Sequence, residues 1–138
     1  MSGPLLDRID IQVGVSAVPV ADLERLSPGE PSEAIRARVM RARSVQAARY
    51  AGMDGVYTNA DARSRDLKDI CRLTESAAAQ IRRAIDDLGL SARAYDRILR
   101  VSRTIADLDG KEAVDADCAM EAVSYRQMDA DEGHSFWA

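Results

Sequence analysis

The stretch from Leu90 to Gly110 constrains the fold of this chain more than any other, because every local helix signal in it agrees. Ser91 is a suitable N-cap and Gly110 a suitable left-handed terminating residue, so the sequence predicts a helix from Ala92 to Asp109. Apolar residues recur there at steps of four, three, four and three positions, which draws one apolar stripe along the helix. The stripe consists of Ala94, Ile98, Val101, Ile105 and Leu108. Four arginines lie off the stripe: Arg93, Arg97, Arg100 and Arg103.

Further helices are predicted on both sides of this one. The first is a long helix from Glu33 to Ala51, capped by Ser32, and the second is a shorter helix that begins at Asn59 or Asp61 and runs through Leu67, Ile70 and Cys71. The third is capped by Thr74 and ends at Gly89. The fourth runs from Ala116 to about Arg126 and is capped by Asp115. The apolar edge of the long helix is expected to consist of Ile35, Val39, Ala42 and Val45.

A strand pattern is clear only near the N-terminus. Apolar residues at positions 9, 11, 13 and 15 alternate with Asp10, Gln12 and Gly14, as in a strand with one buried face. A single strand cannot satisfy its own backbone groups. Either it pairs with an unrecognised segment or its sheet is absent from this chain, and we favour the second.

These patterns predict an all-α bundle of about five helices with an orphan N-terminal strand. We divide the chain into a strand-bearing piece (1–26), a linker with two prolines (27–31), a helical domain (32–126) and a flexible tail (127–138). A length of 138 residues suffices for one domain with a core.

Composition excludes several classes of protein. The net charge of −4 gives no overall case for nucleic-acid binding, so such a case must be local. No apolar run approaches the ~20 residues that a membrane helix needs, and no signal peptide is expected. Cys71 and Cys118 lie far apart in helical patterns and are expected to be buried free thiols, as suits a cytoplasmic protein.

Little in the chain resembles catalytic machinery. The single histidine, His134, lies in the expected tail, and no nucleophilic triad, metal-ligand spacing or GxxxxGK[ST] phosphate loop is present in the sequence. The acidic pairs Asp86-Asp87 and Asp107/Asp109 are interpreted as solvated surface acids.

Two arginines have settings that suit phosphate chemistry. Arg8 stands between Asp7 and Asp10 just before the predicted strand, and Arg93 stands in the first turn of a helix. A guanidinium is always charged and can bind phosphate oxygens in a bidentate manner, and a helix N-terminus adds backbone donors. The alternative is that Arg8 pairs with Asp7 or Asp10 and that Arg93 is surface charge.

Two separated motifs resemble one known family. SGPLLDRIDI, which contains Arg8, resembles the segment near the end of the ATPase core of AAA+ proteins related to the magnesium chelatase I subunit. LSARAYDRILRVSRTIADLDG, followed by a helix ending in AVSYR, resembles the C-terminal lid of the same family. The match covers most of residues 2–126 in the expected order. The Ile9-Asp10 form is closer to the ComM/YifB-type branch than to the true chelatase subunit, where phenylalanine and glycine would follow the arginine.

The resemblance implies roles for individual residues. Arg8 matches the arginine finger, a catalytic residue that reaches the ATP of a neighbouring subunit, and Arg93 matches the sensor-2 arginine, which binds the ATP of its own subunit. Arg97 and Arg100 either line the nucleotide cleft or are surface residues. ATP and Mg²⁺ are the cofactors implied for the full-length protein, whose Walker A and Walker B segments are expected upstream. This chain alone is therefore not expected to bind a cofactor or hydrolyse ATP.

The predicted long helix is strongly basic. It has no acidic residue between Ala34 and Met53 and carries Arg36, Arg38, Arg41, Arg43 and Arg49. Three interpretations remain open: a solvated face, a contact with an adjacent subunit, or a contact with DNA phosphates. Residues 107–132 are acidic, so a basic face could meet an acidic one between copies.

The resemblance therefore implies a lid domain that couples ATP binding and hydrolysis, in a hexameric ring of identical subunits, to DNA remodelling of the helicase or branch-migration type. One alternative is the motor subunit of magnesium chelatase. Another, of a different class, is a helical interaction or nucleic-acid-binding module that uses no nucleotide.

Overall fold

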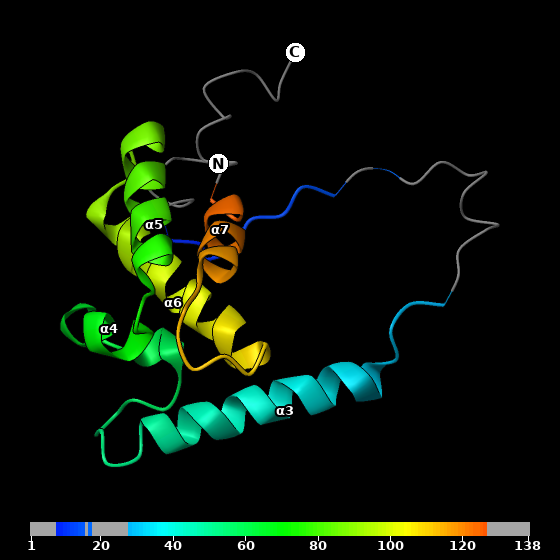
Figure 1. The fold of residues 1–138 in the computed structure, drawn as a ribbon. Coiled ribbons are helices and arrows are strands. Elements are labelled where there is room, and N and C mark those ends of the chain that lie inside the picture. The colour runs from blue at the N-terminus through cyan, green and yellow to red at the C-terminus, as the bar shows by residue number, and fades with distance from the viewer. Residues whose placement is uncertain (1–7, 16, 18–27, 127–138) are drawn as a thin grey trace.

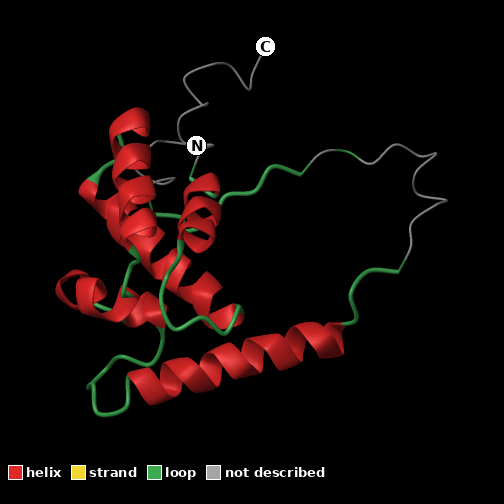
Figure 2. Cartoon of the chain, viewed as in Figure 1, coloured by secondary structure: helices red, strands yellow, loops and turns green. Residues whose placement is uncertain are grey.

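The computed structural model describes residues 8–15, 17 and 28–126, and this part is built from helices (Figure 1). Over these residues the structure contains five α-helices and no β-strand, so the expected helical bundle is confirmed (Figure 2). The elements are α3 (Ser32–Arg49), the short 3₁₀ helix η1 (Asn59–Asp61), α4 (Ser64–Cys71), α5 (Glu75–Leu88), α6 (Ala92–Leu108) and α7 (Ala116–Ser124).

Helix α6 is the centre of the bundle, since α3, α4, α5, α7 and η1 all pack against it. Its predicted apolar stripe is confirmed, with all members buried except the half-buried Leu108. Ile98 is completely buried, and burial of such a side chain stabilises the fold by roughly 1.5–3 kcal/mol. The predicted ends are also right, because the Ser91 hydroxyl accepts a hydrogen bond from Ala94 N–H at 3.2 Å and Gly110 has φ of 70°.

The caps of α5 and α7 follow the sequence prediction as well. The Thr74 side chain accepts a hydrogen bond from Ala77 N–H at 3.2 Å, and the Asp115 carboxylate accepts one from Cys118 N–H at 3.0 Å. Both Cys71 and Cys118 are buried free thiols, as expected. An isolated parallel bridge between Leu73 and Val114 holds the start of α5 to the start of α7.

Helix α3 departs from the prediction in two respects. Pro31, not Ser32, is its N-cap, and no side chain caps the helix. The expected apolar edge is also wrong, because Ile35, Val39 and Val45 are exposed and only Ala42 of that set is buried. Helix α3 lies across one end of the bundle and extends beyond it (Figure 1), so its first turns, which carry Ile35, have no neighbour to cover them. Val45 lies in the packed half of the helix but not on the side that buries Ala42 and Gln46.

The N-terminal segment crosses the surface of α6 and α7. Gln12 N–H donates a hydrogen bond to the Tyr125 carbonyl at 3.2 Å, and the Arg126 side chain donates to the Ile9 carbonyl. The described residues form no sheet that residues 9–15 could join, so their strand conformation in a sheet stays a prediction. The expected tail with His134 lies outside the described residues, as do most of residues 1–26.

Candidate functional site

The N-terminal end of α6 presents Arg93 to solvent. Ser91 caps the helix, which leaves the guanidinium of Arg93 exposed on the first turn. Within the described part of the chain Arg93 makes no hydrogen bond or ion pair, whereas Arg97, Arg100 and Arg103 each bind another residue. Of the four arginines in α6, Arg93 is therefore the one that its own fold does not use.

Arg97, one turn further on, holds the N-terminal segment to α6. Its guanidinium forms an ion pair with Asp10, and 22% of the Arg97 side chain remains exposed. Among the described residues Asp10 pairs with Arg97, and no ion pair joins it to Arg8; the alternative partner of Arg8, Asp7, lies outside these residues. Arg8 is exposed and lies two residues before Asp10. The structure therefore brings the segment that carries Arg8 beside α6, the helix that carries Arg93.

Arg100 and Arg103 are not surface residues. Arg100 donates two hydrogen bonds to the Ala62 carbonyl, at 3.2 and 2.9 Å, and so fixes the start of α4. Arg103 is only 1% exposed and donates to the Lys111 and Glu112 carbonyls, each at 2.7 Å. These two arginines tie loops to the central helix, so Arg100 is engaged within the fold and is not simply surface charge.

Asp107 is the centre of a buried polar cluster, which corrects its interpretation as a solvated acid. Its side chain is 0% exposed and forms ion pairs with both Arg49 of α3 and Arg103 of α6. Asn59 of η1 donates to the same carboxylate at 2.9 Å, and its amide oxygen accepts a hydrogen bond from the Tyr50 hydroxyl at 2.8 Å. This cluster joins three elements that are far apart in the sequence.

The cluster also sets the ionisation of its members. Burial alone would raise the pKa of Asp107, but the hydrogen bonds from Arg49 and Asn59 and the charges of Arg103 and Arg49 outweigh it and lower that pKa. The hydrogen bond to Asp107 in turn raises the pKa of Arg49. The carboxylate is thus held in its charged form, and its two arginines are matched by a buried acid.

The relatives of this chain identify its family. The family model described as magnesium chelatase, subunit ChlI C-terminal, matches residues 29–126. The chain belongs to this family. It is also 40% identical over 129 residues to the competence protein ComM of Haemophilus influenzae, covering 93% of this chain and 24% of that protein. YifB of Escherichia coli is 37% identical over 130 residues, which cover 94% of this chain and 25% of that protein.

The chain therefore spans about a quarter of the length of these relatives. The chelatase C-terminal match begins just before α3 and contains the whole described bundle. Arg93 lies inside the matched range, while Arg8 lies before it.

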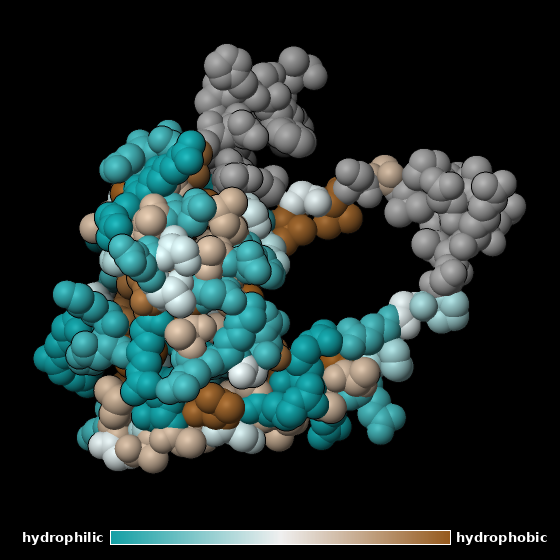
Figure 3. Space-filling model, viewed as in Figure 1, coloured by the Kyte–Doolittle hydropathy of each residue, from teal (hydrophilic) through white to brown (hydrophobic). Residues whose placement is uncertain are grey.

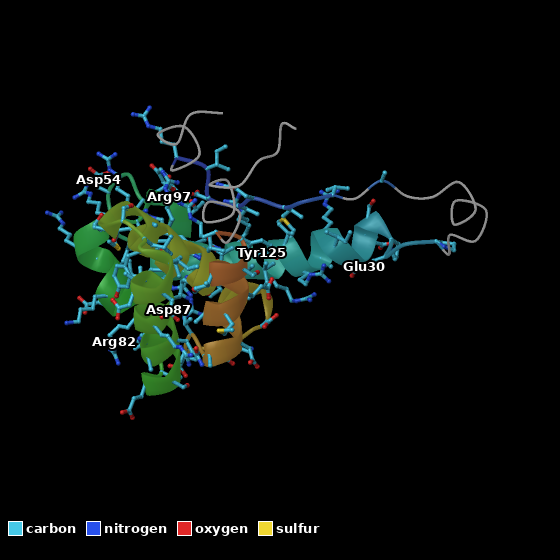
Figure 4. The ribbon with its side chains drawn as sticks, turned by 90° about the horizontal axis from the view of Figure 1, so that it is seen from above. Glu30, Asp54, Arg82, Asp87, Arg97 and Tyr125 are labelled. Atoms are coloured by element: carbon cyan, nitrogen blue, oxygen red, sulfur yellow. The ribbon has the colours of Figure 1, made fainter. Side chains whose placement is uncertain are left out.

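The five arginines of the basic helix α3 have different surroundings in the structure. Arg49 belongs to the buried cluster, and Arg38 forms a bidentate pair with Glu30 at 2.8 and 3.1 Å. Arg36, Arg41 and Arg43 are exposed and make no hydrogen bond or ion pair with a described residue. Figure 4 shows Glu30 at the far end of the molecule from Arg82 and Arg97. The five arginines of α3 are therefore not one interaction surface.

Sequence reasoning missed the acid and the amide that organise the cluster. The spacing of Arg103 and Asp107, four positions apart on one helix, was a signal for their pairing. No local signal pointed to Asn59, whose partners come from two other elements, α3 with its C-cap residue Tyr50 and α6. Among the described residues no group of three acidic, histidine or cysteine side chains could hold a metal ion. None of the described helices is long and apolar enough to cross a membrane.

Proposed function

We propose that this chain is the lid domain of a chelatase-like AAA+ ATPase in which Arg93 binds the phosphates of ATP in its own subunit. The observation that carries the proposal is the exposed, unengaged Arg93 at a capped helix N-terminus, while the other arginines of α6 are bound within the fold. Membership of the chelatase C-terminal family supports it. Such an arginine stabilises charge on the transferred phosphoryl group.

Arg8 supplies the second half of the proposal, because it would reach the ATP of an adjacent subunit in a ring. In that assembly residues 9–15 would leave the surface of α6 and join the sheet of the ATPase core, whose other segments lie outside this chain. ATP would bring its Mg²⁺, which those other segments would hold. The side chains of this chain would orient the phosphates and report their presence to the lid.

The activity that this ATPase serves is proposed to be DNA remodelling. Similarity to the competence protein ComM supports this assignment. The motor subunit of magnesium chelatase is the second candidate, and the description of the matched family favours it. Stimulation of ATP turnover by branched DNA would support the first, and stimulation by a metal-free porphyrin with its partner subunits would support the second.

The test of the Arg93 assignment is ATP turnover by the full-length ATPase. Arg93→Ala is expected to lower turnover on the order of 100-fold, as loss of one preorganised donor does. Arg82→Ala is the matched control, since Arg82 is an exposed arginine on the neighbouring helix α5. Normal turnover in the Arg93 variant would remove the sensor role, and failure of the full-length protein to hydrolyse ATP would favour an interaction module without nucleotide.

The test of Arg8 uses mixed rings. Arg8→Ala is expected to lower turnover by about 1,000-fold or more when every subunit carries it. Subunits with a defective Walker A loop should regain partial activity when mixed with Arg8→Ala subunits, because some interfaces then combine an intact loop with an intact finger. Turnover at the normal rate by uniform Arg8→Ala rings would contradict the assignment.

A further inference from the structure

The exposed side of α3 combines positive charge with apolar surface. We define its basic face as four exposed residues, Arg36, Val39, Met40 and Arg43. They are separated by three, four and seven positions from the first, so they lie on one side of the helix. Val39 is 41% and Met40 56% exposed, and Val39 lies at the edge of this face that is nearest to η1 and the end of α6. In Figure 3 apolar surface interrupts the hydrophilic surface along this helix.

Helix α7 presents the complementary combination. Its buried side packs against α5 and α6, and its opposite side exposes four residues that we define as the acidic face: Asp117, Met120, Glu121 and Ser124. These residues have the same spacing as the basic face. Met120 is 52% exposed, and Asp117 makes no hydrogen bond or ion pair with a described residue. Each face thus has a methionine beside charges of one sign, with opposite signs on the two faces.

The apolar content of the basic face favours a protein partner over DNA. A surface that tracks DNA phosphates needs basic and polar donors, whereas large apolar side chains among the charges are typical of contacts between proteins. The two faces belong to separate parts of one molecule, since α3 packs on α6 while α7 packs on α5 and α6. Their contact is therefore a contact between two copies.

We propose that the basic face of α3 in one copy docks on the acidic face of α7 in a second copy. Arg36 and Arg43 would meet Asp117 and Glu121 of the second copy around a pair of methionines. Such a contact is heterologous, so one copy of the pair retains a free acidic face and the other a free basic face, and the contact can repeat into a ring. Two faces of four residues are smaller than the ~800 Å² per partner of a stable complex, so the isolated pair is expected to be weak.

The proposal deepens the ring arrangement proposed above, but the contact needs no nucleotide. Its failure would leave the Arg93 assignment standing, and failure of that assignment would leave this contact standing.

Disulfide trapping is the experiment, because it captures weak complexes. The chain with Met40→Cys is mixed with the chain with Met120→Cys under a mild oxidant, and a mixed disulfide dimer is expected to form several-fold faster than in a matched control. The control replaces Met120→Cys by Ala79→Cys, which adds an exposed thiol on α5. The native thiols give little background, since both are buried and burial raises the pKa of Cys71 to about 11.

Charge reversal then tests the chemistry of the contact. Arg36→Glu with Arg43→Glu, added to the Met40→Cys chain, should reduce trapping to the control rate. Asp117→Arg with Glu121→Arg, added to its Met120→Cys partner, should restore it, because the two charge patterns are then exchanged. Equal trapping with Ala79→Cys would overturn the proposal. So would charge-reversed arginines that leave trapping unchanged while weakening binding to a DNA duplex.

Discussion

The two ends of α6 carry the same residue type in opposite situations. At the N-terminal end Arg93 is exposed and unengaged by any described residue, whereas at the C-terminal end Arg103 is 1% exposed and bound to an acid and two carbonyls. Both lie at helical spacing off the same apolar stripe. The two arginines differ in exposure because α3 and the loop before α7 pack against the C-terminal end of α6 and not against its N-terminal end. An arginine's role is thus set by partners that are distant in the sequence.

The largest expected effect on stability comes from disrupting the buried ion pair at the C-terminal end of α6. Asp107→Asn should lower the free energy of unfolding by about 3–5 kcal/mol, since it leaves Arg103 buried without its matching charge. Chemical denaturation followed by circular dichroism measures this. Asp109→Asn is the matched control, because Asp109 is exposed and, among the described residues, its ion pair is with Lys111, at 3.2 Å. Equal losses in the two variants would contradict the structural role of the cluster.

The same end should show a characteristic pH dependence. The pKa of Asp107 is lowered in the folded state from its ordinary value of 3.8, so the folded state binds this proton less readily than the unfolded state. Its contribution is therefore complete above the unfolded pKa and is lost as the pH falls through the folded pKa. The stability difference between the wild-type chain and Asp107→Asn should be constant near neutral pH and shrink below about pH 3.8. A difference that shrank as the pH rose would have the wrong sign.

A smaller effect on stability is expected at the N-termini of α6 and α3, where the sequence predicts a serine N-cap for both helices. Ser91→Ala should cost about 1 kcal/mol, because the hydroxyl caps α6 through Ala94 N–H. Ser32→Ala should cost far less, since Pro31 is the N-cap of α3 and Ser32 lies inside the helix. Thermal unfolding of both variants measures the contrast. A larger loss for Ser32→Ala would mean that α3 begins where the sequence predicted.

The smallest effect concerns the residue between the two ends. Arg97→Ala should change the global stability by no more than about 1 kcal/mol, because its pair with Asp10 is partly exposed. It should nevertheless loosen the N-terminal segment, which can be followed by amide hydrogen exchange at Gln12. Unchanged protection at Gln12 would show that the segment is held without this ion pair.

Sequence alone predicted much of the bundle, for identifiable reasons. The stripe of α6 and the caps Thr74, Ser91 and Asp115 depend on residues a few positions apart, which sequence patterns report well. The exposure of Ile35 and Val39 could not be predicted in this way, because it depends on where the bundle ends beneath α3.

The candidate site was predicted unevenly for the same reason. Arg93 and Arg8 were found through the resemblance to a family, and their exposure is compatible with the roles proposed for them. The structural use of Arg49, Arg100 and Arg103 required partners that no local pattern reveals. A row of arginines on one helix is therefore a poor guide to function until the partners of each are known.

Thermal unfolding of the full-length ATPase with and without ATP tests the central claim most directly, since it measures what Arg93 does for the fold and for the ligand together. Without ATP, Arg93→Ala should unfold within about 0.5 kcal/mol of the wild-type protein, because nothing in the described fold depends on it. With ATP, it should lose much of the stabilisation that nucleotide gives the wild-type protein. A variant that is unstable without ATP, or that ATP stabilises fully, would contradict the account.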